Sequence, residues 1–269
     1  MAKHRAVCRR RPLVPVALLT PAAAAGIAVA AAPSAEAAPN PIDNFAGVPG
    51  RTSLTFEYSP LHARVGTANS AEARTGLSTV KLYVADYALR HGDGSPNDVA
   101  LAQRMIQLSD DSAASQLDAK YPNAIAATAG EYGLTNTRRG SFWGDSVTST
   151  ADTVTFLEAK KATDPTSPIL GWMTTAAPIA ADGTPQNWGT TDLPGAIGTK
   201  WGWSDDRTSE VASASFGPDF SVAAHTNGGP NDQNADVGTA FGPAVAPPPP
   251  TIDSIVADIN NRIQQFLPH

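Results

Sequence analysis

Cysteine is almost missing from this chain, since Cys8 is the single one among 269 residues. One cysteine excludes an intramolecular disulfide and a cysteine-rich zinc ribbon, so the apolar core must hold the fold together. Basic residues are also few, with 19 against 25 acidic ones and a net charge of −6. This balance excludes a nucleic-acid binder that relies on a strongly basic surface. Hydrophobic residues make up 42% of the chain, which is enough for a sizeable core and too many for wholesale disorder.

Long apolar runs are also missing, except for one at the N-terminus. Residues 1–11 are rich in Lys and Arg, and residues 12–33 are small and apolar. Ala35–Ala37 then fits an A-x-A cleavage site. This order predicts a secretory signal peptide over residues 1–37. A transmembrane anchor is the less favoured alternative, because two prolines interrupt an Ala-rich run. We therefore expect a secreted, extracytoplasmic protein of the cell envelope with no stable membrane span after cleavage.

The remaining residues, 38–269, are expected to form one domain. Apolar periodicity and turn residues predict two strands, a block of helices, three strands and a last helix. The strands are expected at 54–58, 63–66, 196–203, 211–216 and 220–226, and the helices at 77–90, 96–108, 112–118, 122–132, 150–161, 168–176 and 251–267. Residues 227–250 are rich in Gly, Pro and acid, and we expect a loop there. This order is typical of a helical subdomain (about 76–193) inserted into a sheet subdomain (about 38–75 and 194–269).

A serine and a lysine stand three residues apart near the start of the first predicted helix, in Ser78-Thr79-Val80-Lys81. This spacing puts both side chains on one helical face, one turn apart. A lysine among apolar neighbours is partly desolvated, which lowers its pKa and lets its neutral amine take the serine proton. A capping serine beside a lysine that only covers apolar surface has the same spacing, so the pair alone is weak evidence.

Two further segments carry polar side chains at related places. Ser109-Asp110-Asp111 separates two predicted helices, and Lys200-Trp201-Gly202-Trp203 lies on the first strand of the C-terminal set. Each segment also has a purely structural interpretation. The first would be a helix-capping turn, and the second would be an edge-strand lysine beside packing tryptophans. In this order and spacing, however, the three segments resemble the S-x-x-K, S-D-N and K-T-G motifs of class A β-lactamases and penicillin-binding proteins. The resemblance covers roughly residues 54–227 and the last predicted helix.

The resemblance implies a β-lactamase/transpeptidase-like fold of the α/β (α+β) class, an antiparallel sheet with an inserted all-helical subdomain. Ser78 would be the acylated nucleophile, Lys81 would help to deprotonate it, and Ser109 would relay a proton to the leaving nitrogen. Lys200 would hold Ser109 and attract a substrate carboxylate. Backbone N–H groups of Ser78 and Trp203 would form the oxyanion hole. Such chemistry needs no metal or organic cofactor, so none is expected.

The sequence departs from the family pattern at three places. The family's β-lactamases carry a glutamate that activates the deacylating water, and the short stretch after Thr137 has none; Asp145 is a weaker candidate. Asp111 stands where the family has asparagine, and an ionised Asp accepts hydrogen bonds without donating any. Its charge beside Lys81 would raise the pKa of that lysine. Trp201 stands where the family has Thr or Ser, which removes a hydroxyl from the carboxylate-binding group.

Metal-binding patterns are weak throughout. Asp232, Asn234 and Asp236 alternate like the ligands of a calcium loop, but the glycine and glutamate that such a loop requires are missing. We therefore expect no metal, and the acidic stretch is interpreted as solvated.

Two hypotheses of different class follow. The first is an exported serine acyl-enzyme hydrolase that acts on β-lactams or D-alanyl-type cell-wall peptides through Ser78, with slow deacylation. The substrate-binding residues would be Asp111, Lys200, Trp201, Gly202 and Trp203. The second is a catalytically silent relative that binds cell-wall peptides or a protein partner, and a serine esterase on the same fold is a third possibility. An open Ser78 favours catalysis, whereas Trp201 or Trp203 packed over Ser78 favours the silent hypothesis.

Overall fold

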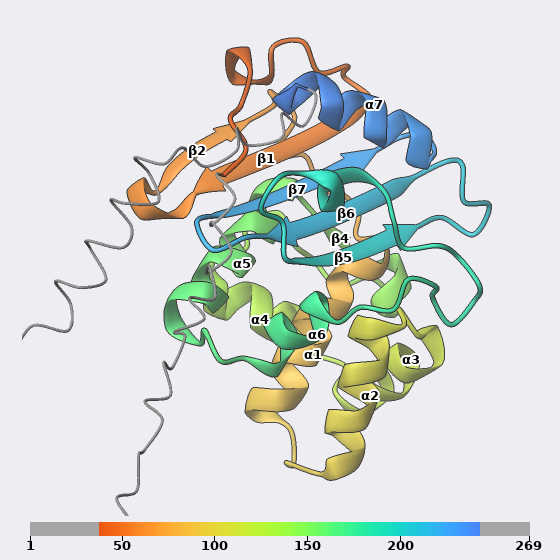
Figure 1. Ribbon diagram of the computed structural model, residues 1–269. Coiled ribbons are helices and arrows are strands. Elements are labelled where there is room, and N and C mark those ends of the chain that lie inside the picture. Colours follow the sequence, from red (N-terminus) through yellow and green to blue (C-terminus); the bar gives the residue numbers. More distant parts are fainter. Residues whose placement is uncertain (1–37, 243–269) are drawn as a thin grey trace, which may run out of the picture. The chain divides into compact units, whose positions relative to one another are not determined.

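The computed structural model describes residues 38–242, which fold around a five-stranded antiparallel sheet (Figure 1). The strand order is β2-β1-β7-β6-β5. The strands are β1 Thr52–Tyr58, β2 Ala63–Gly66, β5 Gly198–Trp203, β6 Val211–Phe216 and β7 Phe220–Thr226, and a separate pair joins β3 Arg74–Thr75 to β4 Val147–Thr148. The predicted signal peptide and the predicted helix at 251–267 lie outside the described residues.

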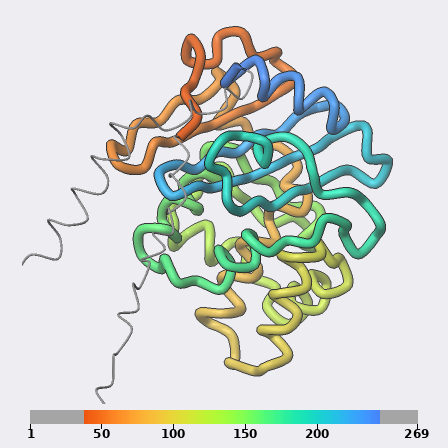
Figure 2. The backbone as a smooth tube through the Cα atoms, in the orientation of Figure 1, coloured from red at the N-terminus to blue at the C-terminus, as the bar shows by residue number. Residues whose placement is uncertain are grey.

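The helices of the described part fall into two sequence groups. They are α1 Lys81–His91, α2 Pro96–Gln107, α3 Asp111–Lys120, α4 Ala124–Tyr132, α5 Thr150–Thr163, α6 Pro168–Thr174 and α7 Pro230–Phe241. The first six lie between β2 and β5 in sequence, while α7 follows β7. The sheet therefore joins strands that are far apart along the chain, and β1 lies directly against β7 (Figure 2). The α/β (α+β) class with an antiparallel sheet is confirmed.

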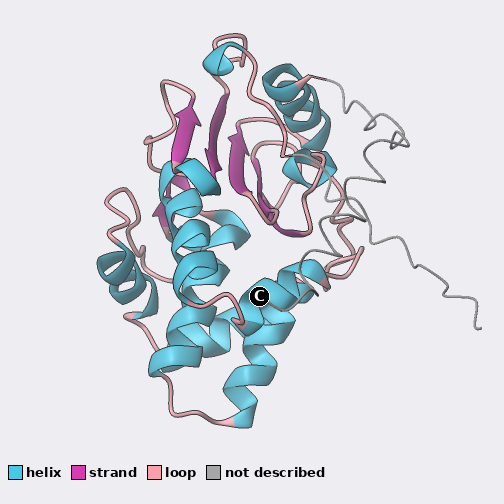
Figure 3. Cartoon of the chain, turned by 60° about the vertical axis from the view of Figure 1, so that its left-hand side comes forward, coloured by secondary structure: helices cyan, strands magenta, loops and turns pink. Residues whose placement is uncertain are grey.

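Side-chain alternation along β1 shows which helix covers which face of the sheet. Ser53 and Thr55 point to α5, where both hydroxyls bond to Thr150. Thr52 points the other way, and its hydroxyl donates to Asp236 on α7. Because successive side chains of a strand face opposite ways, α5 and α7 cover opposite faces of the sheet. Figure 3 shows helices on both sides of the strands.

Most buried apolar side chains belong to two clusters, apart from a small group around Trp188 and Trp201. The larger cluster lies among the helices and includes Tyr83, Met105 and Phe156. A smaller one packs α7 on β1 and β7 through residues such as Phe56 and Val237. Burial of these side chains is the main favourable contribution to folding, at about 1.5–3 kcal/mol for each large side chain.

Hydroxyl groups, rather than aliphatic ones, line much of the α7 face of β5 and β6. Thr199 bonds to Ser215, Ser215 to Thr190, and Thr190 to Ser213. Ser213 then donates to the side chain of Gln233 on α7. All five side chains are buried. Each buried hydroxyl in this series therefore has a partner, which removes most of the cost of burying it.

The expected loop at 227–250 is wrong in part, because residues 230–241 form α7. Pro230 opens the helix at a position that needs no N–H donor, and Asp232 accepts from the backbone N–H of Gly229 at 2.9 Å. The buried face of α7 carries Gln233 and Asp236, whose partners lie on other elements, so no apolar stripe marked it. Within the described ranges, no group of three or more acidic, His or Cys side chains is arranged to hold a metal ion.

Local capping signals were mostly confirmed. Ser95 and Ser149 accept from the backbone N–H groups of Asp98 and Asp152, as N-caps of α2 and α5. The expected start of the third helix at Ser112 is wrong, because Asp110 is the cap and accepts from the N–H of Ala113. A carboxylate at this position satisfies the same free amide as a serine hydroxyl does. The helices of residues 38–242 include none that is long and apolar enough to cross a membrane.

We predict that Asp86→Ala destabilises the protein strongly, because Asp86 and Lys160 form a buried pair at 2.8 Å. The variant leaves the buried lysine without this partner, and the expected loss is about 3–5 kcal/mol in the free energy of unfolding. Urea denaturation measures it. Asp93→Ala is the matched control, because Asp93 and Lys120 form an exposed pair, and its unfolding midpoint is expected to stay close to the wild-type value. Equal losses in the two variants would contradict the prediction.

Candidate active site

Ser78 lies in a short 3-10 helix, η3 (Leu77–Val80), immediately before α1. The preceding residue, Leu77, has φ = +48°, a left-handed conformation that costs a non-glycine residue about 1–2 kcal/mol. Gly202 on β5 faces this turn, and a Cβ at Gly202 would lie 2.7 Å from the backbone nitrogen of Ser78. Only glycine therefore lets β5 approach so closely. Within residues 38–242, the Ser78 hydroxyl makes no hydrogen bond.

Lys81 is a fully buried cation beside this turn. Its Nζ donates to the carbonyl oxygen of Ser109 at 2.6 Å and to Asp111 Oδ1 at 2.5 Å. The ring of Trp143 lies over it, with 4.6 Å from Nζ to the ring centroid. Burial lowers the pKa of Lys81 below its usual range, and the charge and hydrogen bond of Asp111 oppose this effect. The amine is therefore shifted towards its neutral form.

Ser109 lies between two buried lysines, in the turn that joins α2 to α3. Lys200 on β5 donates to Ser109 Oγ at 2.8 Å and to the carbonyl of Trp201 at 2.9 Å, while Lys81 Nζ lies 3.5 Å from the same hydroxyl. Burial and the nearby charge of Lys81 lower the pKa of Lys200 well below its usual range. Ser109 has φ = +52°, which is again left-handed. The geometry allows this hydroxyl to pass a proton, because it can accept from one lysine and donate to a third group.

The two tryptophans of β5 do not face Ser78. Gly202 and Lys200 point towards η3 and the helices, so by strand alternation Trp201 and Trp203 point to the opposite face. Trp201 is buried and its indole N–H donates to the carbonyl of Trp188 at 2.9 Å. Trp203 packs edge-on against Trp188, with 5.7 Å between ring centroids. The arrangement that favoured the silent hypothesis, a tryptophan of this strand packed over Ser78, is therefore not found.

Trp143 is a site residue that the sequence did not single out. It lies in η4 (Trp143–Asp145), and its indole N–H donates to Ser115 on α3 at 3.1 Å. Asp145, the weaker candidate for the missing glutamate, is exposed and accepts a hydrogen bond from Ser141. An indole rather than a second carboxylate therefore covers Lys81 on this side. Its position depends on tertiary contacts, which a loop sequence without periodicity does not reveal.

Asp182 is a second residue that the sequence did not single out. It accepts from the indole N–H of Trp203 at 3.0 Å, at the end of β5. Arg207 donates to the backbone carbonyl of Asp182 at 3.2 Å and lies 3.6 Å from its carboxylate. Asp182 is also close enough to Lys81 for its charge to favour the protonated lysine. The turn that carries Asp182 gave no signal, because its partners are remote in sequence.

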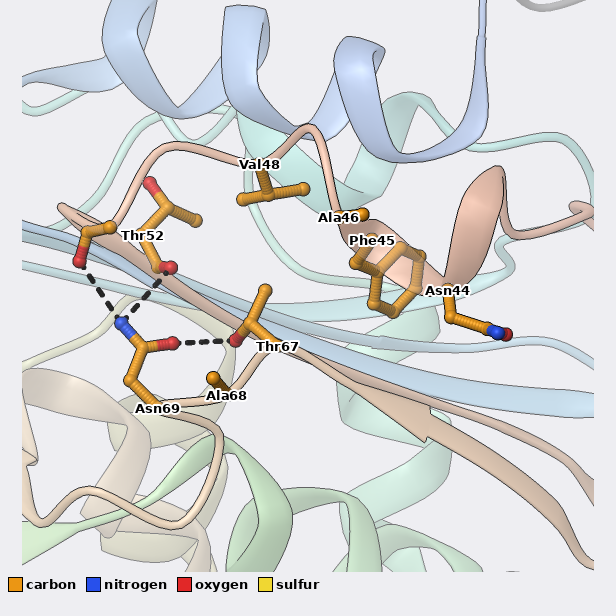
Figure 4. A pocket seen from close by; sticks show the side chains of 9 residues that line it. Asn44, Phe45, Ala46, Val48, Thr52, Thr67, Ala68 and Asn69 are labelled. Carbon is orange, nitrogen blue, oxygen red and sulfur yellow. Dashed lines mark hydrogen bonds between the residues drawn. The ribbon is translucent and has the colours of Figure 1, made fainter.

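A separate cavity of about 440 Å³ lies between the N-terminal segment and β1 (Figure 4). Asn69 spans its floor by donating to the carbonyl groups of Gly50 and Thr52, and it accepts from the hydroxyl of Thr67. These polar groups are all bonded within the protein, and the lining residues include no nucleophile or charged group. We assign no chemistry to this cavity.

Comparisons with known proteins identify the fold. No family model matches the chain, and no curated protein is similar in sequence. The chain is similar in structure to a β-lactamase from Xanthomonas campestris, with a TM-score of 0.55 and 18% identity over 73% of this chain and 92% of that one. A class A β-lactamase from Clostridium kluyveri gives 0.53 and 14% over 71% and 91%. The D-alanyl-D-alanine carboxypeptidase of Mycobacterium tuberculosis H37Rv gives 0.51 and 16% over 87% and 97%.

These similarities confirm the β-lactamase and penicillin-binding-protein-like fold that the three motifs predicted. Sequence identities of 14–18% support the fold and not the activity. The residues that the motifs singled out come together in this fold from η3 (Ser78), α1 (Lys81), the turn between α2 and α3 (Ser109), α3 (Asp111) and β5 (Lys200).

We predict that Gly202→Ala disturbs the site, because the new Cβ would collide with η3. The expected loss is about 1–3 kcal/mol in the free energy of unfolding, together with a rearranged Ser78 turn. Gly130→Ala on α4 is the matched control, since a Cβ there meets open space, and it is expected to be neutral or stabilising by up to about 1 kcal/mol. Thermal and urea unfolding measure both. If the two variants had the same free energy of unfolding, the close approach of β5 to η3 would not contribute to stability.

Proposed function

We propose that this chain is a serine acyl-enzyme hydrolase that acts on β-lactams or D-alanyl-type cell-wall peptides, with Ser78 as the nucleophile. The observation that carries the proposal is the pair of buried lysines around Ser109, next to an unbonded Ser78 hydroxyl. A lysine whose pKa is lowered by burial is the kind of base that this chemistry requires. The substrate classes are those in the names of the structural neighbours, a β-lactamase and a D-alanyl-D-alanine carboxypeptidase.

In the proposed acylation, the neutral amine of Lys81 accepts the proton of Ser78 while Ser78 Oγ attacks the acyl carbon. The backbone N–H groups of Ser78 and Trp203 stabilise the developing oxyanion. Ser109, held by Lys200, then passes a proton to the leaving nitrogen as the scissile bond breaks, and the proton that Lys81 took up replaces it. The product is an acyl ester on Ser78 and a free amine.

Hydrolysis of that ester is proposed to be slow. Removal of the acyl group requires a base that activates water, and the indole of Trp143 occupies the side of Lys81 that faces η4. Asp145 is directed to Ser141 instead. An acyl-enzyme that forms and persists is therefore the expected outcome of contact with a suitable acyl donor.

We place this activity outside the cytoplasm, because the sequence predicts a signal peptide over residues 1–37. A small molecule or a cell-wall peptide is the proposed partner, and the negative charge of the chain argues against nucleic acid.

One observation favours the catalytically silent alternative, a protein that binds cell-wall peptides or a protein partner. The Lys81 ammonium donates its hydrogen bonds to Asp111 and Ser109 rather than to Ser78. The charge of Asp111 also favours the protonated lysine, which is not a base. The two experiments below distinguish this alternative from the acyl-enzyme.

We predict a persistent covalent adduct on Ser78 after incubation with benzylpenicillin or with its methyl ester. The adduct is expected to equal the mass of the acyl donor, because ring opening expels no fragment. Intact-mass spectrometry detects it, and Ser78→Ala, which lacks the nucleophile, is expected to stay unmodified under the same conditions. No adduct with either compound, and no consumption of either, would leave the silent alternative as the better proposal.

We predict that Asp111→Asn moves the pH profile of Ser78 acylation to lower pH. Acylation needs the neutral amine, so its rate falls as pH drops through the pKa of Lys81. The charge of Asp111 raises that pKa, and its removal lets burial lower the pKa further. Adduct formation measured across a pH series gives the profile. Asp219→Asn, at an exposed turn between β6 and β7, is expected to keep the wild-type profile. An unmoved profile in the Asp111 variant would exclude Lys81 as the base.

A further inference from the structure

Solvent-exposed charges beside Ser78 are unusual for a site that would hold an anion. The side chain of Asp111 is 71% exposed and that of Asp182 is 46% exposed. The side chains of Lys81 and Lys200, in contrast, are both 0% exposed. A molecule that approaches from solvent therefore meets the two carboxylates and Arg207, which is paired with Asp182, before it meets the two lysines.

Lys200 is bound within the protein. Its ammonium donates to Ser109 Oγ and to the carbonyl of Trp201. Both acceptors are fixed parts of the fold, and the side chain has no contact with solvent. A carboxylate would have to displace one of these bonds to reach Nζ, which costs more than replacing water.

The other groups that could bind a carboxylate are also absent or engaged. The strand position after Lys200 carries Trp201, whose single donor is bonded to Trp188 on the far face of β5. Arg207 is directed to Asp182, through both its backbone carbonyl and its carboxylate. At the end of β5, the donors of Lys200 and Trp201 are therefore engaged within the protein, and Arg207 is paired with Asp182.

We infer that the site, if it is the acyl-enzyme centre proposed above, selects acyl donors that carry no carboxylate beside the scissile bond. The group next to that bond is neutral or cationic, as in a carboxyl ester or carboxamide. An anion there would lie near Asp111 and Asp182 and would compete with them for Lys81 and Arg207, the cations that they already pair with, and like charges brought together oppose binding. Among β-lactams and D-alanyl-type peptides, the expected acyl donors are therefore those whose carboxylate is converted to an ester or an amide.

The test compares benzylpenicillin with its methyl ester, which shares the acyl group and the strained ring and differs only in the carboxylate. Rates of Ser78 adduct formation are measured by quenched intact-mass spectrometry at one pH. The ester is expected to react at least about tenfold faster than the free acid. Added salt is expected to narrow this ratio, because exposed charges are screened.

Two variants and one control test whether Asp111 and Asp182 cause the difference between the ester and acid rates. Asp111→Asn and Asp182→Asn are each expected to lower the ester-to-acid ratio by about threefold, since each removes one exposed negative charge. The ratio is internal to each variant, so a change in overall reactivity cancels. Asp219→Asn, at the opposite end of the strands, is expected to keep the wild-type ratio.

The outcomes separate the two proposals. Adducts on Ser78 with both compounds, and a free acid that reacts as fast as the ester or faster, would overturn the charge selection and leave the acyl-enzyme standing. No adduct with either compound would overturn the acyl-enzyme itself, and the charge selection with it. The wild-type comparison is decisive even where a variant fails to fold.

Discussion

Two buried lysines that share one serine hydroxyl connect the sheet to the helices at the candidate site. Lys200 comes from β5, Lys81 from α1, and Ser109 from the turn between α2 and α3. Burial and the charge of Lys81 lower the pKa of Lys200, and burial lowers the pKa of Lys81. The burial that joins the two layers thus also shifts the Lys81 amine towards its neutral form, and the proposed chemistry depends on this shift.

Backbone strain accompanies this contact. Leu77 and Ser109 both adopt left-handed φ angles that glycine would adopt more easily. Such conformations persist only where the surroundings hold them, and here β5 presses on η3 through Gly202 while Lys200 holds Ser109. The strain is therefore stored at Ser109 and at Leu77, the residue immediately before Ser78.

The sequence predicted what local chemistry determines. The spacing of Ser78 and Lys81 and the capping serines are local signals, and the three motifs together indicated the fold. The sequence did not reveal α7, because its buried face mixes the polar Gln233 and Asp236 with apolar residues, and the partners of these polar side chains lie on other elements. Trp143 and Asp182 were missed for the same reason, since only the folded chain brings them to Lys81 and Trp203. Non-local pairing thus limits how much of the site a single sequence reveals.

The buried hydroxyl series on the α7 face also bears on strand alignment. Residues 211–226 of β6 and β7 are mostly Ala, Ser, Val and Thr, so side-chain size distinguishes poorly between neighbouring alignments. A slip by one residue would turn Ser213 and Ser215 to the other face and leave Thr190 and Gln233 without partners. Unsatisfied buried polar groups are costly, whereas a slip between small apolar side chains is not. In β6 the polar residues Ser213 and Ser215 therefore help to specify the register.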